Sequence, residues 1–182
     1  MAKSNEVYIQ SFSPLDCKKI LILDRDGTLN QDRGYEHEKA NLFIFPDAIN
    51  FLTKATHLGF GMVLATNQGG AALGEFSIDQ SLEFNAELAA KFAKRDILLS
   101  AAYICFHHPL SSDQDKRNCS CRKPKPGMLT RVLLDYRLEC ENALMVGDQD
   151  TDAQAAANAG IGFRKIGNRN LWDLAITHLE EF

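Results

Sequence analysis

The 182-residue sequence lacks most features that mark secreted, membrane-spanning or disordered proteins. It has only five cysteines, an odd number that argues against a framework of paired disulfides. No apolar run approaches the roughly 20 residues that a membrane helix needs, and the N-terminal segment has no export-signal pattern. We therefore expect a cytoplasmic protein that has no membrane partner.

The chain also lacks a surplus of positive charge. Its formal charge is −4 and its pI is about 5.7, so it has no long-range attraction for nucleic acid. Hydrophobic residues make up 45% and charged residues 24%, as in ordinary globular proteins. We expect a single domain over residues 1–182, and a monomer.

Short apolar runs alternate along the chain with longer segments of helical period. This alternation predicts an α/β fold with a Rossmann-like, mainly parallel sheet and helices on both faces. We predict strands at 20–23, 61–65, 101–106, 143–146 and 163–166. We predict helices at 48–58, 77–95, 127–138, 150–159 and 171–178.

Two long irregular segments, 30–47 and 107–126, follow the carboxyl ends of the first and third predicted strands. Irregular segments of this length in a compact domain tend to be functional. In open parallel sheets the carboxyl edge is also where ligands bind. We therefore expect both segments to overhang one crevice that contains the chemistry.

Asp24 and Asp26 end the first predicted strand. Carboxylates two positions apart on an extended backbone point the same way, and a hard cation such as Mg²⁺ would balance their charge. Two acids at a strand end are more often a solvated turn. Here, however, Thr66, Lys123 and Asp148 follow other strands at the same edge, which favours a functional site.

These motifs resemble those of the haloacid dehalogenase (HAD) phosphatases: D-x-D-G-T, a Thr or Ser, a Lys, and G-D-x-x-x-D. The resemblance spans residues 20–160. It implies that Asp24 attacks phosphorus to form an aspartyl-phosphate. It implies that Asp26 transfers protons to and from the reacting oxygens, which needs a carboxyl whose pKa is held up by its site.

The same resemblance implies a magnesium site formed by Asp24, the backbone carbonyl of Asp26, and Asp148. Thr66 and Lys123 would stabilise the equatorial phosphate oxygens. A further acid lies one helical turn beyond the motif's G-D pair and has two interpretations. Asp152 either orients Lys123 or a metal-bound water, or simply faces the helix dipole as an N-terminal acid.

Three cysteines and two adjacent histidines lie within residues 105–121. Three thiolates and one imidazole form a closed tetrahedral set for structural zinc. The alternative is three buried free cysteines, but the polar stretch 111–118 could hardly order such a loop without a metal. The predicted zinc ligands are Cys105, His107, Cys119 and Cys121. His108 remains an alternative to His107 as the fourth ligand. Such a zinc would also fix the neighbouring Lys123.

The patterns C-x-H-H-P, C-x-C-R-K-P and P-G-M, with the segment 34–38, closely resemble the family of D-glycero-D-manno-heptose 1,7-bisphosphate 7-phosphatases. These enzymes belong to bacterial lipopolysaccharide heptose synthesis. The resemblance implies removal of the C7 phosphate of a small phosphorylated sugar, with Arg122 available for the second phosphate. The substrate-binding residues it implies are Asp32, Arg33, Gly34, Tyr35, Thr66, Asn67, Gln68, Arg122 and Lys123.

Three positions depart from that family's pattern. Gly69 stands where Ser is expected, Leu73 where Arg is usual, and Gln149 where Lys often follows the G-D pair. The spacing between Asp26 and Thr66 leaves no room for a folded cap domain. A loop, rather than a lid domain, must then choose the substrate.

Three alternatives remain. Histidinol-phosphate phosphatases share several motifs, and Glu36 and Glu38 could accept the ammonium group of their substrate. An inactive HAD-like scaffold protein would have no need for the full set of catalytic residues. A nucleic-acid end phosphatase is disfavoured by the charge and by the absence of a basic stripe.

Overall fold

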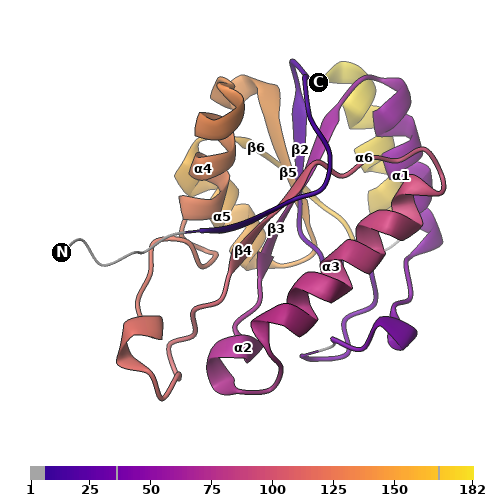
Figure 1. The fold of residues 1–182 in the computed structure, drawn as a ribbon. Helices are drawn as coiled ribbons and strands as arrows, with labels where there is room; N and C mark the ends of the chain where they lie inside the picture. Colours follow the sequence, from indigo (N-terminus) through magenta and orange to yellow (C-terminus); the bar gives the residue numbers. More distant parts are fainter. Residues whose placement is uncertain (1–6, 36, 168) are drawn as a thin grey trace.

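The computed structural model describes residues 7–35, 37–167 and 169–182. A six-stranded sheet runs through it in the order β1-β4-β3-β2-β5-β6 (Figure 1). Neighbouring strands are parallel except β1 and β4, which are antiparallel. The strands are β1 (Tyr8–Ser11), β2 (Ile20–Leu23), β3 (Gly61–Asn67), β4 (Ala101–Cys105), β5 (Ala143–Gly147) and β6 (Gly162–Lys165).

The five predicted strands are confirmed, with ends that differ by at most two residues. The sequence analysis missed β1, a four-residue strand that pairs only with β4 at the edge of the sheet. Its residues are half-buried or exposed, whereas all four residues of β2 are buried. An edge strand needs no continuous apolar run, so β1 gives no signal of the kind used to find the others.

Helices cover both faces of the sheet, as predicted (Figure 1). The described helices are α1 (Pro46–His57), α2 (Gly70–Leu73), α3 (Ile78–Ala93), α4 (Gly127–Tyr136), α5 (Asp150–Ala159) and α6 (Arg169–Glu181). α1, α3 and α6 pack on one face through side chains such as Phe51, Phe84 and Trp172. α4 and α5 pack on the other through Met128, Val132 and neighbouring small residues. The predicted fold class is confirmed.

Local signals explain the helix boundaries. α3 begins at a capping box in which Ser77 and Gln80 each bond the other's backbone N–H. α5 ends at Gly160, which has a φ of 74° and therefore suits glycine. The four-residue α2, which follows β3 directly, was not predicted because it is too short for a helical period to register.

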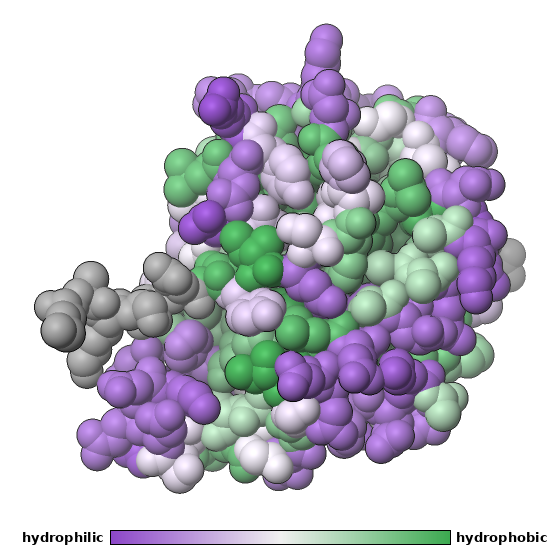
Figure 2. All heavy atoms as spheres, viewed as in Figure 1, coloured by the Kyte–Doolittle hydropathy of each residue, from purple (hydrophilic) through white to green (hydrophobic). Residues whose placement is uncertain are grey.

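The parallel strands bring their carboxyl ends to one edge of the sheet, together with both long loops. The loop between β4 and α4 carries a short 3₁₀ segment, Gln114–Lys116, and its outer side chains are hydrophilic (Figure 2). In the described part of the chain, the segment between Asp26 and Thr66 forms one 3₁₀ turn, α1 and most of β3. It forms no cap domain there. None of the described helices could cross a membrane.

Candidate active site

Lys123 lies at the centre of a buried charge cluster at the sheet edge. Its ammonium nitrogen Nζ is 2.5 Å from Asp24 Oδ1 and 2.7 Å from Asp152 Oδ1. All three residues are buried. Asp24 follows β2, Asp152 lies in the first turn of α5, and Lys123 comes from the loop before α4. The fold thus joins residues that lie far apart in the sequence.

The pKa values in this cluster follow from burial and charge. Burial raises the pKa of Asp24 to about 7, although the Lys123 ammonium opposes the change. Burial lowers the pKa of Lys123, but Asp24 and Asp152 outweigh it and leave the pKa raised. Lys123 therefore stays charged, and a further cation beside Asp24 would favour its ionised form.

Asp152 fulfils both interpretations given to it. Its Oδ1 contacts Lys123, and its Oδ2 accepts a hydrogen bond of 3.1 Å from the backbone N–H of Gln149 at the start of α5. The same carboxylate therefore caps the helix and fixes the lysine.

Asp26 has a different environment. Its carboxylate accepts hydrogen bonds from the Arg25 guanidinium at 2.7–3.1 Å, from Asn30 Nδ2 at 3.0 Å and from Gln68 Nε2 at 2.9 Å. Burial raises the pKa of Asp26. The charge of Arg25 and these hydrogen bonds lower it by more than burial raises it, so the pKa lies below the ordinary value. The expectation that the site holds this pKa up is wrong for the protein without substrate, because the adjacent Arg25 is an ion-pair partner.

Asp148 completes a group of oxygen ligands. One carboxylate oxygen of Asp24, Asp148 and Asp152 each lies within 4.8 Å of the other two. Thr28 Oγ1 and Gln149 Nε2 donate to the two oxygens of Asp148, at 3.0 and 2.5 Å. These hard, anionic oxygens fit Mg²⁺. Thr28 was not predicted as a site residue, although it belongs to the D-x-D-G-T motif.

Gly27 is required by the approach of Asp148. Its φ is 82°, and a side-chain carbon added there would lie 2.5 Å from Asp148 Oδ2. The motif's glycine therefore gives the backbone its turn and leaves space for the carboxylate.

Two small cavities open at this edge of the sheet. We call the first, of about 130 Å³, the lysine cavity; it is lined by Asp24, Asp26, Thr66, Asn67, Lys123, Gln149, Thr151 and Asp152. We call the second, of about 200 Å³, the tyrosine cavity; it is lined by Arg25, Asp26, Asp32, Gly34, Tyr35, Asn67, Gln68, Gly70 and Phe76. Asp26 and Asn67 belong to both, so they lie at the boundary between the cavities.

The predicted substrate-binding segment 32–35 contributes to the tyrosine cavity, with one exception. Asp32, Gly34 and Tyr35 line it, whereas the exposed Arg33 donates to Gln31 Oε1 instead. The sequence analysis missed the aromatic contribution of Phe76, which no motif marks. Tyr35 and Phe76 have ring centroids 6.5 Å apart.

Both aromatic rings lie against Gly70. A side-chain carbon added to this residue would be 2.7 Å from Tyr35 Cδ1 and still nearer to Phe76. The lack of a side chain at Gly70 therefore makes room for the rings that line this cavity.

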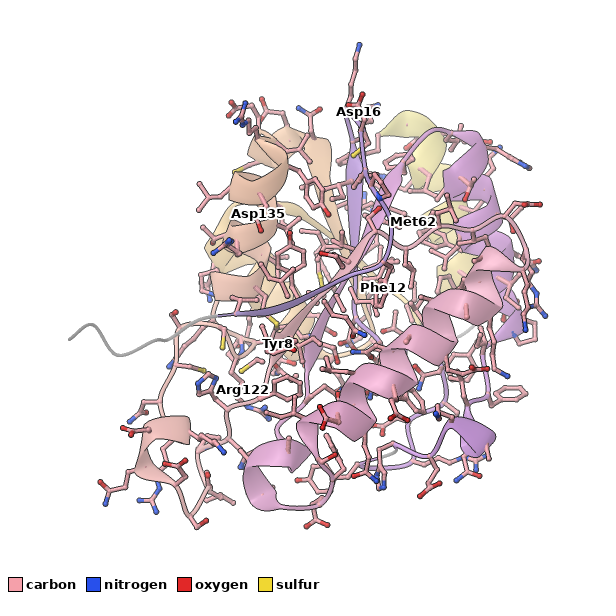
Figure 3. All side chains as sticks on the ribbon, in the orientation of Figure 1. Tyr8, Phe12, Asp16, Met62, Arg122 and Asp135 are labelled. Atoms are coloured by element: carbon pink, nitrogen blue, oxygen red, sulfur yellow. The ribbon has the colours of Figure 1, made fainter. Side chains whose placement is uncertain are left out.

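Arg122 occupies space that a side chain at position 69 would fill, where this sequence has Gly69 instead of the serine expected for the family. A side-chain carbon added to Gly69 would lie 2.8 Å from Arg122 Nη1 and 2.8 Å from His108 Cδ2. Arg122 Nη1 donates to the backbone carbonyl of His107 at 3.1 Å. Arg122 lies near the end of the loop between β4 and α4 (Figure 3) and is not among the residues that line either cavity. It would have to rotate to reach a second phosphate.

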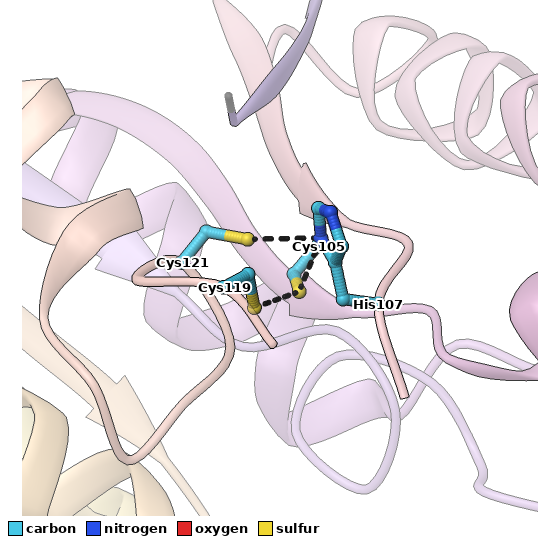
Figure 4. Close-up of side chains that lie close together, drawn as sticks. All are labelled: Cys105, His107, Cys119 and Cys121. Carbon is cyan, nitrogen blue, oxygen red and sulfur yellow. Dashed lines mark hydrogen bonds between the residues drawn. The ribbon is translucent and has the colours of Figure 1, made fainter. Parts of the chain in front are cut away.

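The four predicted zinc ligands come together in one cluster (Figure 4). Cys105 Sγ lies 3.7 Å from Cys119 Sγ and 3.6 Å from His107 Nδ1, and Cys121 Sγ lies 3.4 Å from His107 Nδ1. Tetrahedral bonds of about 2.3 Å would separate sulfur ligands by about 3.8 Å, so these spacings fit zinc. His108 faces elsewhere, because its Nδ1 accepts from the backbone N–H of Leu110. Of the two histidines, the geometry favours His107.

The thiols of this cluster influence one another. The hydrogen bond with Cys121 lowers the pKa of Cys105 to about 6, and the reciprocal interaction with Cys105 raises the pKa of Cys121. Ionisation of Cys105 thus suppresses ionisation of Cys121, and a divalent cation would supply the charge that lets both ionise. Cys119 also ties the cluster to the active site, because its sulfur accepts from the backbone N–H of Arg122 at 3.4 Å.

Known proteins are similar to this chain in sequence and in fold. A family model described as HAD-hydrolase-like matches residues 120–163. The D-glycero-beta-D-manno-heptose-1,7-bisphosphate 7-phosphatase of Haemophilus influenzae is 38% identical over 143 residues, which cover 79% of this chain and 78% of that protein.

Solved structures agree in fold. The D,D-heptose 1,7-bisphosphate phosphatase of B. bronchiseptica, crystallised with magnesium and phosphate, superimposes with a TM-score of 0.77. It is 28% identical and covers 90% of this chain and 99% of its own. A HAD-like phosphatase from Mesorhizobium loti, 23% identical, superimposes with a TM-score of 0.88 over 98% of this chain and 95% of its own.

The identity to the H. influenzae enzyme over most of both chains decides the family, and the arrangement of motifs at the sheet edge agrees with it. The chain belongs to the D-glycero-D-manno-heptose-1,7-bisphosphate 7-phosphatase family of HAD-like hydrolases.

Proposed function

We propose that this protein is a magnesium-dependent phosphatase that removes the C7 phosphate from D-glycero-D-manno-heptose 1,7-bisphosphate in lipopolysaccharide heptose biosynthesis. The observation that carries the proposal is the lysine cavity, where Asp24 and Lys123 meet at 2.5 Å beside Asp148. We also propose that residues 1–182 act as one domain and as a monomer.

Asp24 is the proposed nucleophile. Its carboxylate would attack phosphorus and form an aspartyl-phosphate as the P–O bond to the sugar breaks. Water would then attack the aspartyl-phosphate, release inorganic phosphate and restore Asp24, so one difficult hydrolysis is replaced by two easier steps. Lys123 and Thr66 would donate to the equatorial oxygens of the phosphate. Magnesium, held by Asp24, the Asp26 carbonyl and Asp148, would neutralise the charge that otherwise keeps the two anions apart.

Asp26 is the proposed acid and base, and its position at the boundary of the two cavities supports this role. A phosphate in the lysine cavity and a sugar in the tyrosine cavity would place the scissile oxygen near this boundary. Because Arg25 keeps the pKa of Asp26 low, the carboxyl needs help to hold a proton for the leaving oxygen. The negative charge of a bound phosphate would raise the pKa of Asp26, so that its carboxyl can hold this proton.

The tyrosine cavity is the proposed sugar site. Asp32 and Gln68 offer polar groups for hydroxyls, and the Tyr35 and Phe76 rings offer apolar surface for the sugar ring. Arg122 would turn from the His107 carbonyl toward the second phosphate.

One observation favours histidinol phosphate as a second candidate substrate. Asp32 is one of the residues that line the tyrosine cavity, and its carboxylate could accept an ammonium group. Glu38, which the sequence analysis offered for the ammonium group, is exposed. Glu36, which the sequence analysis offered for the same purpose, lies outside the described residues.

We further propose one structural zinc ion bound by Cys105, His107, Cys119 and Cys121. The spacings of the sulfur and nitrogen atoms support it. Zinc would hold the segment that leads directly into Arg122 and Lys123, and would therefore affect catalysis through position rather than through contact with the substrate.

A phosphate-release assay tests the function. Purified protein with Mg²⁺ would be given heptose 1,7-bisphosphate, the corresponding monophosphates, histidinol phosphate and p-nitrophenyl phosphate. We expect the highest kcat/KM with the bisphosphate. A clear preference for histidinol phosphate would make that compound the substrate in place of the heptose bisphosphate. Release of phosphate from no ester at all would favour the scaffold interpretation.

A further inference from the structure

Lys123 has no strand or helix to hold its backbone in place. It lies in a turn in which the N–H of Lys125 donates to the carbonyl of Arg122 at 2.9 Å. The turn ends the long loop that follows β4 and precedes α4. Yet the ammonium group must meet Asp24, directly after β2, and Asp152 on α5.

Asn67 makes two hydrogen bonds to the backbone of Lys123. Its Oδ1 accepts from the Lys123 N–H at 3.0 Å, and its Nδ2 donates to the Lys123 carbonyl at 3.1 Å. The two partners also fix the orientation of the amide, because the flipped amide would set like groups against each other. Asn67 is the last residue of β3, so its own backbone is paired in the sheet opposite Cys105.

We propose that Asn67 is a positioning residue that places Lys123, rather than mainly a ligand of the sugar. This inference rests on the proposed function. The Asn67 carboxamide makes the same paired N–H and C=O contacts that a neighbouring strand would make, but just beyond the end of the sheet. It thereby joins the turn that carries Lys123 to β3. Side-chain amides suit this role because they carry one acceptor and two donors in one plane.

A second asparagine supports the same turn more weakly. Asn158 Nδ2, at the end of α5, donates to the carbonyl of Pro124 at 3.0 Å. Asn158 is exposed and holds one backbone group of the neighbouring residue, whereas Asn67 is half-buried and holds both groups of the lysine itself. We therefore expect the effect of Asn67 on catalysis to be the larger.

The alternative role is contact with the substrate. Asn67 lines both cavities and keeps one free N–H bond direction and one free lone pair beyond the two hydrogen bonds to Lys123. A sugar ligand would mainly change KM for the sugar substrate. A residue that places Lys123 would change kcat/KM equally for every phosphate ester.

The experiment compares Asn67→Ala with wild-type protein on heptose 1,7-bisphosphate and on p-nitrophenyl phosphate. We expect kcat/KM to fall about 100-fold with both esters, mainly through kcat, because moving a catalytic group by about 1 Å has an effect of that size. Asn158→Ala should lose less. Asn50→Ala, an exposed residue of α1 outside both cavities, serves as the control.

A double variant separates positioning from other roles. In Lys123→Ala protein, the further change Asn67→Ala should cause no additional loss, because there is no ammonium group left to place. An equal loss in both backgrounds would overturn the proposal, as would a loss confined to KM for the sugar substrate.

If Asn67→Ala does not fold, Asn67→Asp keeps the shape and the acceptor but sets an oxygen against the Lys123 carbonyl. It should show the same equal loss with both esters. Wild-type protein inactive on every ester would refute the proposed function itself, whereas active wild-type with unimpaired Asn67 variants would refute only this inference.

Discussion

The lysine cavity and the tyrosine cavity lie side by side but are built in opposite ways. The charged groups at the centre of the first, Lys123, Asp24 and Asp152, are buried and contact one another. The loop that lines the second is exposed: Tyr35 is 50% accessible, and the exposed Arg33 donates to Gln31, two residues before it in the same loop. One cavity is anchored to strand and helix ends, and the other depends on a loop.

This contrast separates chemistry from selectivity. Most groups that must be placed within fractions of an ångström come from the ends of β2, β3 and α5. Lys123 comes from a loop, but Asn67 holds its backbone against the end of β3. Groups that choose among substrates come from a loop that can vary without disturbing the sheet. Changes in the lysine cavity should therefore affect all esters, and changes around the tyrosine cavity should affect only the sugar substrate.

The largest expected effect is that of Asp24→Asn. Removal of the nucleophile should lower kcat by about 10⁵-fold or more with the bisphosphate and with p-nitrophenyl phosphate alike. Phosphate release measures it, and circular dichroism checks that the fold is kept. Asp79→Asn, in the exposed first turn of α3, is the matched control. Retained turnover would reject Asp24 as the nucleophile.

The next effect is that of the sulfur cluster. Cys119→Ser should remove bound zinc, loosen the turn that carries Lys123, and lower kcat about 10- to 100-fold with both esters. Metal analysis and kinetics on the same sample decide the matter. Cys140→Ser, outside the cluster, should keep both zinc and activity. Full activity and an ordered loop in zinc-free protein would show that the cysteines have another purpose.

A smaller and selective effect is expected from Arg122→Ala. The variant should lose about tenfold in kcat/KM for the bisphosphate, the value of one hydrogen bond to a charged group, and stay within about twofold for p-nitrophenyl phosphate. Arg33→Ala, which removes another loop cation, should change neither rate. If Arg122→Ala impaired both esters equally, Arg122 would belong with the residues that place Lys123.

The sequence predicted the lysine cavity better than the tyrosine cavity, for the same physical reason. Strands such as β2 must be apolar throughout because helices cover both faces, so their ends, and Asp24 with them, can be located from the sequence. Ligand chemistry likewise marked Cys105, His107, Cys119 and Cys121 as a group before any geometry was known.

What the sequence could not show depends on how side chains are oriented. The lowered pKa of Asp26 follows from Arg25 folding back onto it, and the position of Arg122 follows from the missing side chain at Gly69. Phe76 reaches the tyrosine cavity only because α2 and the turn after it bring the ring over Gly70. The edge strand β1 was missed because half-exposed residues carry no buried pattern.

The smallest effect expected is on stability, and it concerns only the lysine cavity. Burial raises the folded-state pKa of Asp24 from 3.8 to about 7. The resulting contribution to stability is complete below pH 4 and is lost as the pH rises through about 7. Metal-free wild-type protein should therefore lose stability relative to Asp24→Asn as the pH rises from 5 to 8, by on the order of 1 kcal/mol for each pH unit below about 7.

Denaturant unfolding of both proteins at several pH values measures this difference. Other titrating groups, including His108 and His178, are present in both proteins and cancel in the comparison. Asp26 contributes to stability with the opposite pH dependence. Because its pKa is lowered in the folded state, its contribution is present above about pH 4 and is lost only at lower pH. Saturating Mg²⁺, which favours ionised Asp24, should abolish the loss in the wild-type protein alone. Parallel stability curves without metal would mean that Asp24 is ionised throughout this range, and that Lys123 compensates its burial fully.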